Sequence, residues 1–293
     1  MIVNPSTLHG IFVGFNTIFN RAFQGQQPQY TRIATVVPST TSEETYAWLG
    51  DLPGMREWIG DREIQNLSGS GYTIRNKEFE MTVGVKRSEI EDDKIGLYNP
   101  SIEMMGEAAA LHPDELCFGL LSSGFDQKCF DGNAFYSDKH KVGEKLVSNK
   151  VTAPLSLESY TAARARMMGL KNSKGKSLNL VPNLLVVPPA LEKAARDIVM
   201  ADQINGTTNT MKGTATVHVE TRLKSDTEWH LLCTQRPLKP VIYQQRKKAK
   251  FVSITDEKSP NVFMSGEYLY GVDSRGNAGY GFWQMAQGST GKG

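Results

Sequence analysis

Four oxygen-bearing side chains lie close together in segment 125–141 and have the chemistry of a metal site: Asp126, Asp131, Asn133 and Asp138. Carboxylate and amide oxygens are the ligands that Ca²⁺ prefers, and a metal held by them could also promote hydrolysis. The spacing fits no calcium-loop motif, however, and the Asp-Gly pair in the segment is equally a turn signal. We therefore expect a loop with short strands and no bound metal.

Cysteine and histidine are the other residue types that catalyse reactions or bind metals, and the chain has 3 cysteines and 5 histidines. The cysteines form no CxxC pair, which excludes a zinc ribbon and a thioredoxin-type dithiol. Cys117 and Cys233 lie in apolar sequence, so we expect buried free thiols in a reducing cytoplasm. No histidines have HxxxH or HExxH spacing. A cysteine–histidine nucleophile pair would need only to meet in space, but it has no local signature here.

Other catalytic or cofactor-binding motifs are absent. The Gly/Lys segment 171–177 lacks the GxxxxGK[ST] pattern of a phosphate-binding loop, and GxSxG does not occur. The glycines between 271 and 281 are not followed by a helical pattern, as a dinucleotide site requires. We expect no catalytic residues, no cofactor and no metal ligands, and we predict that the chain is not an enzyme.

Two charged stretches of opposite sign remain as candidates for binding. The acidic stretch comprises four carboxylates: Glu89, Glu91, Asp92 and Asp93. It is expected to be a solvated segment or a subunit contact. The basic stretch comprises six cations: Arg236, Lys239, Arg246, Lys247, Lys248 and Lys250. It is expected to contact phosphates of nucleic acid or the acidic stretch of a neighbouring subunit.

Composition excludes several classes of protein. The 293 residues carry 33 Lys+Arg against 31 Asp+Glu, and 39% are hydrophobic, which is ordinary for a globular chain and argues against disorder or a dedicated nucleic-acid binder. No run of about 18 apolar residues indicates a membrane span. The first ten residues do not resemble a secretory signal, so we expect no membrane partner.

The N-terminal residues 1–45 are predicted to form an arm. Within 6–23, seven apolar residues recur at helical spacing: Leu8, Ile11, Phe12, Phe15, Ile18, Phe19 and Phe23. Ser6 or Thr7 is the expected N-cap. This helix either packs on its own domain or reaches another subunit, in which case Phe12, Phe15 and Phe19 would be contact residues.

A long hairpin is predicted over 62–87. Apolar residues alternate with polar ones in its second half, at Phe79, Met81, Val83 and Val85, which indicates a strand with one buried face. Residues 62–67 would supply the partner strand across a Gly/Ser tip. Because a hairpin alone is marginally stable, it must lie on its own domain or on a neighbour.

The longest helical pattern covers 101–124, with Ser101 as N-cap and Gly124 as C-cap. Pro113 predicts a kink, or a restart of the helix with Asp114 in the new first turn.

Beyond this helix the patterns change. Alternating strands and helices predict an α/β domain over 155–236, and strand-like segments follow to the C-terminus. Among the latter, the segment 273–276 reads as the turn of a hairpin.

Several long segments resemble the major head subunit of Mu-like phages, the gpT family. They are TYAWLGDLPGMREWIGDREIQNLSGSGYTIRNKEFEMTVGVKRSEIEDDKIGLYNP (45–100), MGEAAALHPDELCFGLLSSGF (105–125), CFDGNAFYSDKH (129–140), NLLVVPPALEKAARDI (183–198), LKPVIYQQRKKAKF (238–251) and EYLYGVDSRGNAGYGFWQMA (267–286). The resemblance covers nearly the whole chain, with 141–154, 170–178 and the last seven residues as its weak regions.

The resemblance implies an α+β fold of the Hong Kong 97 phage-capsid type. The implied organisation is an N-terminal arm (1–45), an extended loop with flanking strands (46–95), a peripheral domain with a long spine helix (96–154), an axial domain (155–236), and return strands of the peripheral domain with a C-terminal tail (237–293). Under this organisation we expect the helix 6–23 and the hairpin 62–87 to lie on neighbouring subunits.

The resemblance also implies partners. The subunit would form pentamers and hexamers in an icosahedral shell, with a scaffold, a head protease and a portal taking part in assembly in the bacterial cytoplasm. The shell would enclose double-stranded DNA through non-specific contacts. From the initial Met1 we expect that no N-terminal scaffold segment has been removed.

Two other functions remain open from the residues. The same fold could form an encapsulin-like compartment around protein cargo, which neighbouring genes for a cargo enzyme, in place of portal and terminase genes, would indicate. A soluble hydrolase could instead use the cluster from Asp126 to Asp138, and metal-dependent turnover lost in Asp131→Ala would indicate that class.

Overall fold

The computed structural model describes residues 2–47, 49–50, 71–256 and 258–292. The α-helices are α1 (Pro5–Gly25), α2 (Arg87–Glu91), α3 (Asn99–Ser123), α4 (Leu157–Met168), α5 (Glu192–Val199) and α6 (Pro260–Ser265). The strands are β1 (Ala34–Pro38), β2 (Glu43–Tyr46), β3 (Tyr72–Arg75), β4 (Lys77–Lys86), β5 (His140–Val142), β6 (Lys145–Val147), β7 (Lys150–Val151), β8 (Leu184–Val187), β9 (Gln203–Ile204), β10 (Thr207–Thr208), β11 (Thr216–Val219), β12 (Trp229–Leu232), β13 (Val241–Ile254), β14 (Glu267–Tyr280) and β15 (Ala286–Ser289).

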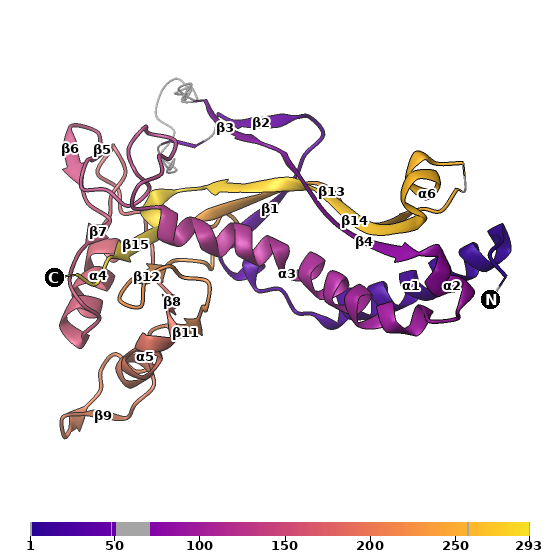
Figure 1. Cartoon of the computed structure of the whole chain (residues 1–293). Helices are drawn as coiled ribbons and strands as arrows, with labels where there is room; N and C mark the ends of the chain where they lie inside the picture. Colours follow the sequence, from indigo (N-terminus) through magenta and orange to yellow (C-terminus); the bar gives the residue numbers. More distant parts are fainter. Residues whose placement is uncertain (1, 48, 51–70, 257, 293) are drawn as a thin grey trace.

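A long four-stranded sheet forms the extended half of the molecule, in the order β1-β13-β14-β4. The strands β13 and β14 are antiparallel and are connected through α6, and β4 pairs antiparallel with β14. The long helix α3 runs beside this sheet, and α1 lies alongside the outer part of α3 (Figure 1). Helix α6, α2 and the N-terminus therefore gather at one end of the molecule, far from the C-terminus (Figure 1).

Helix α1 begins at Pro5, one residue before the range 6–23 that the sequence pattern predicts. Its N-cap is Asn4, whose side-chain oxygen accepts a hydrogen bond from the Thr7 backbone N–H at 2.9 Å, so the expected caps Ser6 and Thr7 lie inside the helix. Pro5 occupies the first turn, where its missing N–H needs no partner.

The apolar face of α1 is buried within its own chain. Phe15 and Phe19 are each 2% exposed, and Phe12 stacks on Phe251 of β13 with ring centroids 5.7 Å apart. The expectation that this helix covers a neighbouring subunit is therefore corrected: Phe15 and Phe19 lie in the core of the long sheet, and Phe12 is half-buried against it. Intramolecular packing satisfies this face because α3 approaches closely enough to cover it.

Helix α3 is continuous from Asn99 to Ser123, so the predicted restart at Pro113 does not occur. It also begins before Ser101, the expected cap, while Gly124 is the C-cap as predicted. Packing along β13 and β14 holds both sides of the proline in one helix.

A second, five-stranded sheet lies at the other end, in the order β11-β8-β12-β15-β7. The strands β8 and β12 are buried at every position, as expected for the centre of a sheet covered on both faces. Two of the strands, β7 and β15, come from outside the predicted domain limits 155–236, so the C-terminal strand belongs to this sheet and not to the long one.

The strands of the predicted hairpin have other partners. β3 pairs with β2, and β4 pairs with β14, whereas the expected partner 62–67 and the tip lie outside the described residues. The alternation in β4 is correct in part: Val85 is buried, but Met81 is 40% exposed.

The predicted turn at 273–276 is wrong, because this segment lies in the middle of β14. A Cβ on Gly276 would lie 2.5 Å from the Gln244 carbonyl oxygen, so the glycine is required by a close approach of strands.

Among the described residues, none of the helices combines the length and apolar character needed to cross a membrane.

The contact between α1 and α3 depends on Gly106. A Cβ added at this position would lie 2.6 Å from the Phe19 carbonyl oxygen. We predict that Gly106→Ala lowers the free energy of unfolding by about 1–2 kcal/mol, because overpacking outweighs the gain in helix propensity. Gly119→Ala, in the same helix with nothing within 4 Å of the new methyl, should instead raise it by up to about 1 kcal/mol. Urea unfolding followed by circular dichroism measures both, and shifts of the same sign would contradict this packing.

Candidate functional site

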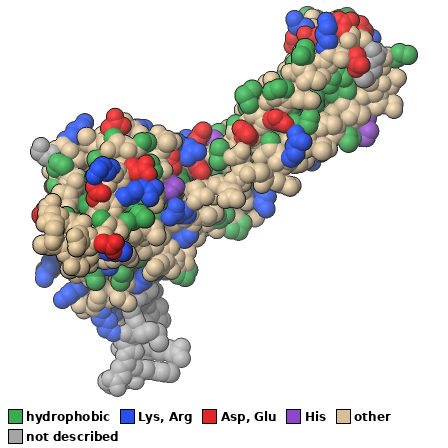
Figure 2. Space-filling view, turned by 90° about the horizontal axis from the view of Figure 1, so that it is seen from below, with side chains coloured by type: hydrophobic (Ala, Val, Ile, Leu, Met, Phe, Trp, Pro, Cys, Tyr) green, Lys and Arg blue, Asp and Glu red, His purple; other side chains and the backbone are tan. Residues whose placement is uncertain are grey.

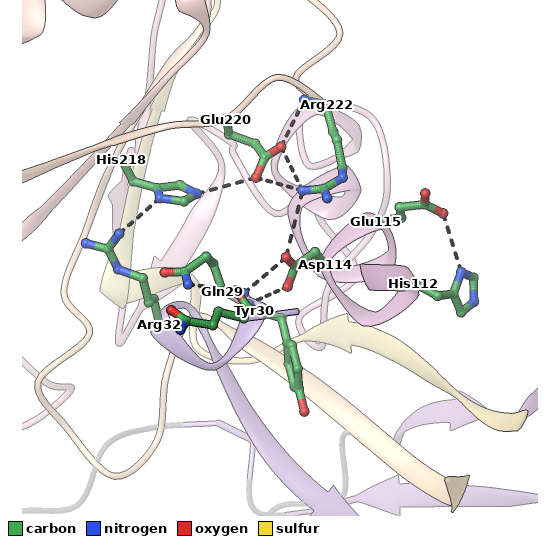
Figure 3. Close-up of polar contacts among 10 residues, drawn as sticks. Gln29, Tyr30, Arg32, His112, Asp114, Glu115, His218, Glu220 and Arg222 are labelled. Atoms are coloured by element: carbon green, nitrogen blue, oxygen red, sulfur yellow. Dashed lines mark hydrogen bonds and ion pairs between the residues drawn. The ribbon is translucent and has the colours of Figure 1, made fainter. Parts of the chain in front are cut away.

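A buried carboxylate joins the two halves of the molecule. Asp114 of α3 is 2% exposed, and its two oxygens accept hydrogen bonds from the backbone N–H groups of Gln29 (3.0 Å) and Tyr30 (2.6 Å) (Figure 3). The Arg222 guanidinium lies 3.9 Å from the same carboxylate. The turn after α1, the middle of α3 and the segment after β11 are therefore joined at one residue.

The network continues through the segment that follows β11. Glu220 is 3% exposed and lies 3.1 Å from Arg222 and 3.4 Å from the His218 ring (Figure 3). Burial acts to raise the pKa of Glu220, but hydrogen bonds from His218 and the Arg222 N–H, with the Arg222 charge, outweigh it and lower that pKa. Arg32 lies 3.0 Å from the other His218 ring nitrogen, which connects β11 to the turn after α1.

Sequence reasoning placed Asp114 in a helix first turn and missed its role. The available signal was a charged residue on the same face of the helix as the apolar Cys117 and Leu121. Such a position predicts a buried carboxylate that needs donors, but the donors come from backbone 84 and 85 residues away.

The six cations of the basic stretch do not form one surface. Arg236 donates to the backbone carbonyls of Leu178 and Asn179, and Lys239 donates to the Thr31 carbonyl. Partial burial also lowers the pKa of Lys239. These two residues therefore hold loops of their own chain together, which removes them from the predicted contact surface.

The other four, Arg246, Lys247, Lys248 and Lys250, are exposed on β13. The register of β13 against β14 shifts between Gln245 and Lys247 and again before Lys250. These irregularities interrupt the alternation of the strand, so three consecutive cations face solvent. Lys247 pairs with Asp273, and Arg246 donates to the Ser39 carbonyl at 3.3 Å. We call Arg246, Lys247, Lys248 and Lys250 the basic bulge.

The acidic stretch lies on α2 and the turn after it. Glu91 pairs with Arg87 at 3.1 Å, Asp92 pairs with Lys94 at 3.0 Å, and Glu89 accepts a hydrogen bond from the Tyr98 hydroxyl. Nearby cations therefore balance part of its charge. Figure 2 shows acidic and basic side chains gathered at this far end of the molecule.

An apolar tip is exposed at the same end and was missed by the sequence reasoning. Phe263 and Met264 of α6 are 83% and 81% exposed. Large apolar side chains this exposed at adjacent positions are typical of contact sites. The short α6, capped by Ser259 and ended by left-handed Gly266, fixes them outside the sheet.

The segment 125–141 does not bring together the four residues that suggested calcium. Among the described residues, the group of ligating side chains found here is Cys129, Asp131 and His140, without Asp126 or Asp138. The Asp131 carboxylate lies 2.6 Å from His140 Nδ1 and 3.2 Å from Cys129 Sγ. Burial acts to raise the pKa of Asp131, but hydrogen bonds from these partners and the Asn133 N–H hold it at about 2.

All three cysteines are free and buried, as predicted. Burial raises the pKa of each thiol, which keeps Cys117, Cys129 and Cys233 protonated at neutral pH. Burial likewise lowers the pKa of His230 to about 3, so this core histidine is neutral.

Comparison with known sequences finds head subunits of phages. The family described as Mu-like prophage major head subunit gpT matches residues 8–153, 146–223 and 219–292. The Mu-like prophage FluMu major head subunit of Haemophilus influenzae is 37% identical over 290 residues, 99% of this chain and 75% of the relative. The major capsid protein of Escherichia phage Mu is 33% identical over 286 residues, 98% of this chain and 74% of that protein.

Solved structures give the same result. The chain is similar to a subunit in the procapsid of bacteriophage JBD30, with a TM-score of 0.63 and 36% identity over 98% of this chain and 76% of that one. A JBD30 capsid chain gives a TM-score of 0.59 at 29% identity, over 76% of this chain and all of that one. A virus-like particle from Pyrococcus furiosus, at 8% identity and a TM-score of 0.53 over 94% of this chain and 97% of that one, shares the fold alone.

The buried carboxylate makes a testable prediction. Asp114→Asn retains one acceptor oxygen for two backbone N–H groups, so one donor loses its partner, and we expect a loss of about 2–3 kcal/mol in unfolding free energy. Glu115→Gln is the matched control, because that side chain is 62% exposed. Equal urea midpoints for the two variants would show that the junction does not contribute to stability.

Proposed function

The chain belongs to the Mu-like prophage major head subunit family, gpT, and from that premise we propose that it assembles as pentamers and hexamers into an icosahedral shell around double-stranded DNA. It is a major capsid protein with the Hong Kong 97-type fold, a structural component of the virion and not an enzyme. The observation that carries the proposal is the match to head subunits over nearly the whole chain.

The partners of assembly are a further part of the proposal. The JBD30 relative was solved both as a procapsid and as a capsid, so that subunit occupies two shell states. We infer that this chain likewise enters a procapsid in the host cytoplasm. A scaffold, a head protease and a portal would act there before DNA is packaged.

The two sheets support revised domain boundaries within the subunit. We assign the long sheet with α1 and α3 to the peripheral domain, and the five-stranded sheet with α4 and α5 to the axial domain. The axial domain then includes β7 and β15, and the N-terminal helix belongs to the peripheral core. The extended loop over 46–95 remains a proposal, since 51–70 lie outside the described residues.

Three surfaces are proposed as subunit contacts: the apolar tip on α6, the acidic stretch on α2 and the basic bulge on β13. The tip is apolar and exposed, and cover from another copy would remove it from water. The acidic stretch lies at the same end as the tip (Figure 1), so a neighbour that covers the tip also meets negative charge. The basic bulge of another copy, or packaged DNA, would supply the complementary charge.

The two alternative functions have less support. The encapsulin-like compartment is not favoured, because the relatives at 33–37% identity are head subunits and the Pyrococcus furiosus particle shares only the fold. The hydrolase depended on convergence of Asp126, Asp131 and Asp138, and the ligating group found among the described residues contains only Asp131 of these.

Replacing the apolar tip should uncouple assembly from folding. We predict that Phe263→Ser combined with Met264→Ser reduces the yield of closed particles at least about tenfold, since each buried apolar side chain contributes about 1.5–3 kcal/mol per contact. The unfolding midpoint of the subunit should stay unchanged, because both side chains are exposed in the single chain. Val13→Ser, at a 48% exposed position on α1, is the control. Normal particle yield from the double variant would remove the tip from the contact surfaces.

Neutralising the basic bulge tests its two proposed partners. The triple variant Arg246→Gln, Lys247→Gln and Lys248→Gln should lower particle yield if the bulge meets an acidic stretch. If it meets phosphates, particles should form but retain less DNA as salt rises. A variant that exchanges Arg and Lys at these positions keeps the charge and should behave as wild type. Unchanged assembly together with unchanged DNA retention would reject both roles.

A further inference from the structure

The convergence of Cys129, Asp131 and His140 points to a binding site for a divalent transition metal of the zinc class, which we propose as a feature of this subunit. The metal-binding atoms of the three side chains lie within 4.8 Å of one another. Sulfur, nitrogen and oxygen donors together suit Zn²⁺ or Co²⁺ and are a poor set for Ca²⁺, which takes oxygen ligands. The structure thus changes the class of metal that segment 125–141 would bind.

The three donor groups need only a small rearrangement to form a tetrahedral site. With metal–ligand bonds of about 2.0–2.3 Å, neighbouring donors in such a site are separated by about 3.3–3.6 Å. Here Oδ1 of Asp131 lies 3.2 Å from Cys129 Sγ, and the other oxygen, Oδ2, lies 2.6 Å from His140 Nδ1. Rotation of the carboxylate about its side-chain bonds would turn one oxygen towards both partners and open the second distance by less than about 1 Å, which would admit the ion.

The histidine is already oriented as a ligand. Its Nε2 lies 3.2 Å from the Phe135 carbonyl oxygen, which fixes a proton on that nitrogen and directs Nδ1 towards Asp131. A backbone carbonyl in this position is the outer-shell partner that metal-binding histidines commonly use. The ring also stacks on Trp283, with centroids 4.0 Å apart and an interplanar angle of 3°.

Burial gives the site a closed side and an open side. Cys129 is 4% exposed and His140 fully buried, whereas the side chain of Asp131 is 21% exposed. An ion could therefore enter past the carboxylate, and a water molecule would complete four ligands on that side. Binding replaces the thiol proton of Cys129 and the proton shared between Asp131 and Nδ1 of His140 with bonds to the metal, and both protons leave to solvent.

A bound metal would cross-link the two ends of the loop 129–140. The loop packs against the C-terminal part of α3 and against Trp283, which precedes β15. A metal joining the two ends of this loop would hold the five-stranded sheet and the end of α3 in one arrangement. This cross-link would stabilise the folded subunit, because the unfolded chain has no preformed site for the metal.

Cobalt binding to the purified 293-residue chain, after metal removal with a chelator, tests the proposal. We expect one Co²⁺ per subunit, with a near-ultraviolet thiolate-to-cobalt charge-transfer band and the strong visible bands of a four-coordinate ion, all removed by added Zn²⁺. Cys129→Ser should abolish the thiolate band. It should also weaken Co²⁺ binding by more than about 100-fold, because loss of an outer-shell partner alone typically costs about 10- to 100-fold. Cys117→Ser and Asp138→Asn are matched controls and should bind as wild type.

A measurement on the wild-type chain removes dependence on variant folding. Under mild denaturation, Zn²⁺ should slow alkylation of Cys129 at least about tenfold, read by peptide mass spectrometry, while Cys117 reacts at an unchanged rate. A missing thiolate band, a band that survives Cys129→Ser, or equal protection of Cys129 and Cys117 would overturn the proposal. None of these outcomes depends on shell assembly, so the proposed function would stand or fall separately.

Discussion

The rest of the structure depends on the carboxylate of Asp114, which is buried in the middle of the long helix α3. A buried charge is costly unless donors surround it, and here two backbone N–H groups and a nearby guanidinium compensate it. Around this residue α3 passes from one core to another. Met105 lies in the core of the long sheet, and Phe118 lies in the core shared with the five-stranded sheet. The junction therefore fixes how the two halves are joined.

Much of the fold could be predicted from local patterns, because local energetics determine those elements. The apolar spacing of α1 and the length of α3 follow from burial of one face, and the alternation in β4 does so in part, at Val85. The long segments such as CFDGNAFYSDKH, which resemble the head subunits of Mu-like phages, then indicated the capsid fold. Strand pairing was harder to predict, because nothing in the sequence of 286–289 indicates that β15 joins a sheet with β7 and β12. The turn predicted at 273–276 was wrong because the sequence does not show whether Gly276 serves a flexible turn or a close approach of two strands.

Functional residues were harder to predict because they depend on convergence in space. In the sequence, Asp131 belongs to a cluster of oxygen ligands whose spacing fits no calcium loop, and His140 has no histidine partner at metal-binding spacing. Only the folded loop brings them within 2.6 Å. The six cations of 236–250 were treated as one patch, yet backbone carbonyls of the chain itself bind two of them, and irregularities in β13 expose the others. Most of these groups therefore have partners within the subunit. The apolar tip and the charged surfaces remain exposed, and they are the surfaces proposed for contacts that the symmetry of a shell repeats.

The most direct test of the account is electron microscopy in negative stain, with mass measurement, of the purified chain co-produced with its scaffold. A major head subunit with this fold should form closed shells whose mass corresponds to many copies of one 32.4 kDa chain. A single-copy mass and no closed particles, from protein that is folded by circular dichroism, would contradict the central claim that this chain builds a capsid.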